Sequence, residues 1–165
     1  MTNTIYDNSI TQLLSDNNTN IINSEANMNR VEKTKLLVGN LLAQKFLHVC
    51  AADILNEVKG TEYRKDTKPN CSECFKCTRT MLTLDYLGAL DEFRGRFDPE
   101  KYYMEVKPRL EYEAYLGGDH YQREIFALMK EKGFEPSLKM KVRKYLYLRK
   151  KAVKRKLKQI LRYGK

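Results

Sequence analysis

The chain has 165 residues, of which 42% are hydrophobic, and it carries 31 Lys or Arg against 21 Asp or Glu, a formal net charge of +10. This length suits one folded unit with tails and leaves little room for two large domains. No run of 18 or more apolar residues occurs, and the polar, Asn-rich residues 1–20 lack the basic patch and apolar stretch of a signal peptide, so we expect a soluble cytoplasmic protein.

The positive charge is concentrated at the C-terminus. Residues 138–165 contain thirteen Lys or Arg and no Asp or Glu, which leaves 18 basic and 21 acidic residues in the remainder of the chain. The body is therefore mildly acidic. An argument from charge to a polyanionic partner applies to the last 28 residues alone.

The N-terminal part of the chain shows short, mixed patterns. Residues 7–18 can form one short helix, and residues 19–23 are a β-type stretch. Asn29 and Glu32 have the spacing of a capping box, which predicts a helix over residues 30–42, although Gly39 disfavours its second half. The apolar residues 46–49 predict a short buried strand that delivers Cys50.

From the second group of cysteines onward the pattern is helical. Residues 59–70 are a polar surface excursion. A helix begins near Phe75 and ends at Gly88, and a further short helical stretch precedes Pro99. Asp119 can cap an amphipathic helix that ends at Gly133. Beyond Pro136, apolar residues recur through the basic tail and predict a long basic amphipathic helix.

These patterns predict a mainly α protein with one or two short strands, organised around a metal site formed by four cysteines. We expect a polar N-terminal segment over residues 1–20, a mainly helical metal-binding domain over 21–137, and a basic helical tail over 138–165.

The four cysteines carry the most specific signal in the sequence. Cys71, Cys74 and Cys77 are each separated by two residues, and Cys50 precedes them by twenty-one positions. Spacing of this kind lets successive thiolates turn onto one ion, while amides of the turn donate to the sulfurs. In a reducing cytoplasm such cysteines are metal ligands more often than disulfide partners.

Zinc is the first choice of metal, because it accepts four thiolates in tetrahedral geometry without redox chemistry. A [4Fe–4S] cluster is the alternative, since it also takes four thiolates and tolerates this spacing. Four sulfur ligands leave no coordination position open for water, so a zinc site here is structural. The sequence alone also allows four unligated thiols.

Three segments together resemble a known family: residues 29–33, residues 48–50 and residues 70–81, NCSECFKCTRTM. Their order is similar to the C-terminal half of PP-loop ATP pyrophosphatases such as the queuosine-pathway deazaguanine synthases. The resemblance covers about residues 5–100. It implies that Cys50, Cys71, Cys74 and Cys77 hold a structural zinc.

The chain departs from that family in important ways. No segment has the SGGxDS form of the family's phosphate-binding loop, the interval after Cys50 is longer than the family's short gap, and Asn29 stands where Ser is common. The resemblance therefore implies the zinc-bearing half of such an enzyme without its catalytic half. It is either a truncated or split gene product, for which a second chain would supply the ATP-binding PP-loop domain, or a domain that lost catalysis and kept the scaffold. On this hypothesis the candidates to face a shared nucleotide site are Arg30, Glu32, Lys33 and Arg79, with a helix cap and solvated charges as the alternative.

A second hypothesis assigns nucleic-acid binding to the basic tail. Its phosphate-binding candidates are Lys141, Arg143, Lys144, Arg149, Lys150, Lys151, Lys154, Arg155 and Lys156. Tyr145, Tyr147 and Tyr163 can stack on unpaired bases. An anionic membrane surface ranks below nucleic acid, because the tail has no Trp and few large aliphatic residues. No pair of nucleophile and base stands out, so we do not expect catalysis by this chain alone.

Overall fold

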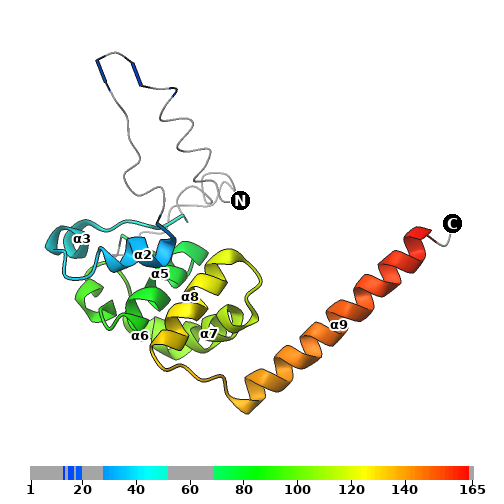
Figure 1. The fold of residues 1–165 in the computed structure, drawn as a ribbon. Helices are drawn as coiled ribbons and strands as arrows, with labels where there is room; N and C mark the ends of the chain where they lie inside the picture. The colour runs from blue at the N-terminus through cyan, green and yellow to red at the C-terminus, as the bar shows by residue number, and fades with distance from the viewer. Residues whose placement is uncertain (1–12, 14, 17, 20–27, 52–68, 164–165) are drawn as a thin grey trace, which may run out of the picture. The chain divides into compact units, whose positions relative to one another are not determined.

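The computed structural model describes residues 13, 15–16, 18–19, 28–51 and 69–163 (Figure 1). This part of the chain is mostly helical, and it contains no strand. The chain divides into two compact units, Met1–Pro99 and Glu100–Lys165. The domain boundaries after residues 20 and 137 remain predictions.

The first unit contains α2 (Arg30–Lys35), α3 (Leu41–Phe46), α5 (Phe75–Tyr86) and the 3-10 helix η1 (Leu90–Phe93). The capping box that begins α2 is confirmed: the Glu32 amide donates to Asn29 Oδ1 at 2.9 Å, and the Asn29 amide donates to Glu32 Oε2 at 2.7 Å.

The predicted single helix over residues 30–42 is wrong in its second half. The chain leaves the helix after Lys35, and Gly39 adopts the left-handed conformation, with φ of 72°. Asn40 then begins a new helix, because its Oδ1 accepts from the amides of Leu42 and Ala43. A glycine that permits a turn, followed by an N-cap residue, outweighs the apolar periodicity on which the prediction relied.

The strand predicted over residues 46–49 is also wrong. Phe46 is the last residue of α3, and residues 47–50 have no regular secondary structure. A buried Asn side chain occupies the hydrogen-bonding position that a neighbouring strand would fill. Most of the helix expected at residues 7–18, of the β-type stretch expected at residues 19–23 and of the excursion expected at residues 59–70 lies outside the described residues.

The core of the first unit forms where α2 packs on α5 and where η1 packs on both α3 and α5. Its buried hydrophobic residues are Val31, Ala51, Cys77, Met81, Leu82, Leu84, Ala89, Leu90, Phe93 and Phe97. The predicted helix from Phe75 to the glycine at 88 is confirmed, since α5 covers Phe75–Tyr86 and Gly88 follows with φ of 72°. One ligand candidate, Cys77, is thus part of the hydrophobic core.

The second unit opens with an almost continuous helical stretch. It consists of α6 (Pro99–Lys101), the π-helix η2 (Tyr102–Val106) and α7 (Lys107–Leu116). The Lys107 amide donates to the Tyr102 carbonyl, five residues back. Pro108 has no amide hydrogen, so one backbone hydrogen bond of the helix is missing there. The wider π-helical turn of η2 lets the chain continue as a helix despite this loss.

Two further helices complete the second unit. The predicted helix after Asp119 is confirmed as α8 (His120–Glu131), with Asp119 and Gln122 forming a capping box. It packs against α7 and buries Ile125, Leu128 and Met129. The long basic helix is confirmed as α9 (Leu138–Tyr163), drawn in orange and red in Figure 1.

Candidate metal centre

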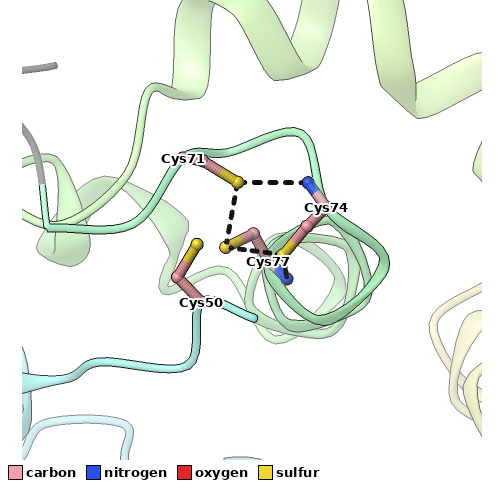
Figure 2. A group of neighbouring side chains, drawn as sticks. All are labelled: Cys50, Cys71, Cys74 and Cys77. Atoms are coloured by element: carbon pink, nitrogen blue, oxygen red, sulfur yellow. Dashed lines mark hydrogen bonds between the residues drawn. The ribbon is translucent and has the colours of Figure 1, made fainter. Parts of the chain in front are cut away.

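The structure brings the four cysteines together. Their Sγ atoms all lie within 4.8 Å of one another. Cys71 and Cys74 precede α5, Cys77 lies in its first turn, and Cys50 approaches from the other side on the segment that follows α3 (Figure 2). The Sγ atom of Cys77 is 3.4 Å from that of Cys74 and 3.9 Å from that of Cys71. None of the four cysteines forms a disulfide.

Backbone amides of the turn point at the sulfurs, as the spacing predicted. The Cys74 amide donates to Cys71 Sγ at 3.2 Å, and the Cys77 amide donates to Cys74 Sγ at 3.5 Å. Cys74 is also the N-cap residue of α5, so the positive end of the helix dipole lies at the sulfur cluster. Both effects offset the negative charge that thiolate ligands bring to the site.

The protonation states of the cysteines differ in the metal-free site. The hydrogen bond with Cys77 lowers the pKa of Cys74 to about 4. The same hydrogen bond raises the pKa of Cys77 above the usual range of a thiol, and burial of the side chain is the second cause of this rise. Burial raises the pKa of Cys71. At neutral pH Cys74 is therefore a thiolate while Cys71 and Cys77 hold protons, and a bound cation has to displace these protons.

Asn70 connects the two parts of the site, and the sequence analysis missed it. Its Oδ1 accepts from the amides of Val49 and Cys50 at 2.8 and 3.1 Å, and its Nδ2 donates to the Leu47 carbonyl at 2.9 Å. The side chain is 1% exposed. Asn70 therefore fixes the segment that carries Cys50 beside the turn that carries the other three cysteines. Its only signal in the sequence is its position immediately before Cys71.

Ser72 and Arg96 hold in place the segments that carry the cysteines. Ser72 adopts the left-handed conformation, with φ of 59°, and its buried hydroxyl accepts from the Asp98 amide at 2.9 Å. Arg96 Nε donates to the Leu47 carbonyl at 2.9 Å. The segment after η1 thus braces both the turn and the segment before Cys50.

Replacing Asn70 by Ala is expected to lower the free energy of unfolding of the metal-bound chain by about 2–4 kcal/mol, because three hydrogen bonds are lost and buried groups are left unpaired. Urea denaturation followed by circular dichroism measures the change. Asn40→Ala is the matched control, since it removes two hydrogen bonds at an exposed helix cap and should cost about 1 kcal/mol. Equal losses in the two variants would contradict the bridging role of Asn70.

The residues proposed to face a shared nucleotide site have local roles in the described structure. The Glu32 carboxylate is held by the Asn29 amide in the capping box. The Arg79 guanidinium lies over the Phe75 ring, 5.8 Å from its centroid. Arg30 is exposed at the start of α2, and Lys33 is half-buried one turn later. The alternative reading of these residues, a helix cap with surface charges, therefore accounts for the positions of Glu32 and Arg79.

The basic candidates for nucleic-acid binding all lie on α9. Each of them is exposed except Lys144, which is half-buried. Lys144 Nζ donates to the backbone carbonyl of Tyr115 and lies 4.0 Å from the centroid of the Tyr115 ring. The Arg143 guanidinium is 5.4 Å from the centroid of the Tyr112 ring. Two of the predicted phosphate ligands are thus engaged with α7.

His48, two residues before Cys50, is exposed and does not belong to the sulfur cluster. Comparison of the chain with protein-family models, curated proteins and solved structures finds no match. The described helices include none that is both long enough and apolar enough to span a bilayer.

Proposed function

We propose that Cys50, Cys71, Cys74 and Cys77 hold one structural zinc ion in a helical domain that works with a separate ATP-binding chain. The observation that carries the metal assignment is the mutual distance of the four Sγ atoms, all within 4.8 Å. Tetrahedral zinc with a Zn–S distance of about 2.3 Å separates its sulfurs by roughly 3.8 Å. The distances of 3.4 and 3.9 Å around Cys77 lie close to that value.

The same distances favour a single ion over a [4Fe–4S] cluster. In such a cluster each thiolate binds a different iron atom at a corner of a cube, so the four sulfurs lie further apart than they do around one ion. A group of Sγ atoms within 4.8 Å of one another suits one central atom better. Amide donors to Cys71 and Cys74 suit either metal and do not discriminate.

The zinc proposed here is structural. Four thiolates fill its tetrahedral coordination and leave no position for a reacting water. The ion joins the segment that ends at Cys50 to the first turn of α5, and these two parts are separated by twenty residues in sequence. Metal binding thereby contributes to folding of the first unit.

The two-chain part of the proposal rests on the sequence resemblance to PP-loop enzymes and on an exposed apolar surface. On α3, Gln44 faces η1, where its Nε2 donates to Glu92 Oε2 at 2.8 Å. The apolar side chains of α3 face solvent: Leu41, Leu42 and Phe46 are 76%, 70% and 62% exposed. Clustered exposed apolar side chains of this kind are typical of protein interfaces. An ATP-binding domain is the partner that the resemblance supplies.

Metal analysis of the purified chain tests the first part of the proposal. The chain is produced without added metal, purified anaerobically, and assayed for zinc, iron and sulfide. We expect about one zinc per chain, no sulfide and no broad visible absorbance. Iron with stoichiometric sulfide would contradict the zinc assignment and would indicate an iron–sulfur centre.

Nucleotide titration tests the second part. Because the sequence has no phosphate-binding loop of the SGGxDS type, the isolated zinc-loaded chain should give no calorimetric signal with Mg–ATP at millimolar concentration. Tight ATP binding by the chain alone would contradict the need for a second chain, while leaving the zinc assignment intact.

A further inference from the structure

We propose that α9 is a docking surface for an anionic phospholipid bilayer, on which it lies flat with an apolar stripe facing the lipid. This inference concerns the second unit and depends neither on the metal nor on the PP-loop resemblance. The sequence analysis ranked nucleic acid above a membrane surface for this segment, and two features of the folded chain reverse that order.

The first feature is the direction in which α9 meets the rest of its unit. Lys144 and Arg143 of α9 lie against Tyr115 and Tyr112 of α7. A basic side of the helix therefore faces α7. The usual arrangement, in which an amphipathic helix buries its apolar side against its own domain, is not adopted here.

The second feature is the apolar stripe left on the opposite side. Its members fall within an arc of about 100° on a helix of 3.6 residues per turn. Each is at least half exposed, and they are Leu138, Val142, Leu146, Val153 and Leu157, at 78%, 50%, 51%, 57% and 54%. Arg149 interrupts the stripe near its centre, and Lys139 and Lys156 lie at the two edges of the same arc. The long side chains of these three residues can extend to bring their charges to headgroup level.

The charge of α9 is complementary to an anionic partner. Its 26 residues include no Asp or Glu, so the basic side chains have no acidic neighbour on the helix. Like charges four residues apart, such as Lys150 with Lys154 and Lys151 with Arg155, destabilise a helix by mutual repulsion. An anionic surface relieves this repulsion, and both nucleic acid and acidic lipid meet that need.

The stripe decides between these two anionic partners. Phosphate contacts of a nucleic acid use the basic side chains and leave the aliphatic ones in water. A bilayer of acidic lipid accepts both, with aliphatic side chains at the boundary of the acyl region and Lys and Arg among the headgroups. A helix that is low in mean hydropathy, strongly basic and clearly two-sided is the type that lies in this interface.

A pair of tryptophan reporters tests the orientation, because the chain has no Trp of its own. Leu146→Trp places the reporter on the stripe, and Tyr147→Trp places it about 100° further round the helix, toward the side that meets α7. The two positions are 51% and 45% exposed, so the reporters start from similar environments. The full-length, zinc-loaded chain is mixed with vesicles of phosphatidylcholine alone or with about one third phosphatidylglycerol.

We expect the Leu146→Trp emission to shift to shorter wavelength with the anionic vesicles only, while the Tyr147→Trp emission stays unchanged. A Leu146→Asn/Val153→Asn variant keeps every charge and should partition at least about tenfold more weakly, since burial of one aliphatic side chain corresponds to roughly a tenfold change. Unchanged circular dichroism and zinc content exclude a folding defect.

Other outcomes overturn the proposal. Absence of binding to anionic vesicles overturns it, as does an equal spectral shift at both reporters. Binding to a 20-base-pair RNA duplex without binding to vesicles assigns α9 to nucleic acid instead. Where both ligands bind, the Leu146→Asn/Val153→Asn variant decides between them. Loss of its vesicle binding, with RNA binding retained, supports the lipid surface. Equal vesicle affinity of this variant and the unsubstituted chain contradicts it.

Discussion

Removal of the metal ion is expected to unfold the first unit while the second unit keeps its helices. Structural zinc sites of this type contribute about 10–16 kcal/mol of apparent binding free energy, which equals or exceeds the total stability of a typical domain, about 5–15 kcal/mol. The site joins Cys50 to α5, and Cys77 lies within the hydrophobic core, so loss of the ion disturbs the core directly. Hydrogen exchange in the presence of a strong chelator measures the effect by segment.

The second unit is the internal control of this experiment, because all four cysteines precede residue 78. Amides of α7 and α8 should keep their protection, while those of α5 around Met81 and Leu84 should lose it. Zinc should restore the protection and magnesium should not, since magnesium prefers oxygen ligands. Protection of α5 that survives complete metal removal would contradict a structural role for the ion.

Two substitutions in α5 separate the metal from the packing. Cys77→Ser removes a ligand and should abolish stoichiometric zinc binding. Thr83→Ser removes one methyl group from another buried residue of the same helix and should cost only about 1 kcal/mol. A similar loss of zinc in both variants would indicate that general destabilisation, and not ligand chemistry, governs occupancy.

The features that the sequence predicted correctly depend on neighbours within a few residues. The predicted capping box at Asn29 and the predicted N-cap at Asp119 each depend on a partner three residues away, and both are present. The turn that carries Cys71, Cys74 and Cys77 is equally local, because each amide donor lies three residues from its sulfur. Local spacing restricts the geometry strongly, so pattern alone was sufficient there.

The features that the sequence did not predict depend on partners distant in the chain. Asn70 bonds to residues 20 to 23 positions earlier, and no local pattern indicates that contact. Apolar periodicity also failed to show which side of α9 faces α7. It identified the apolar side of α9, but the helix meets α7 through Lys144, a choice set by the tyrosines of α7 and not by the hydropathy of α9.

Zinc affinity is expected to fall steeply with decreasing pH. Zinc binds thiolates, and the pKa values of Cys77 and Cys71 are raised, so both hold protons at neutral pH and must release them when the ion binds. Cys74, with its pKa lowered to about 4, already carries its charge and releases none in this range. Release of at least two protons corresponds to about a hundredfold loss of affinity per pH unit, and roughly ten-thousandfold between pH 8 and pH 6.

Competition with a chelator of known protonation behaviour measures this slope, and calorimetry in two buffers of different ionisation enthalpy counts the released protons independently. Both methods should give a value of two or more. A slope below one, with fewer than one proton released, would mean that the cysteines are already ionised before the metal arrives. The hydrogen bond between Cys74 and Cys77 would then not hold a proton in the site, and the amide donors of the turn, together with the N-terminus of α5, would be the dominant stabilisers of the thiolates.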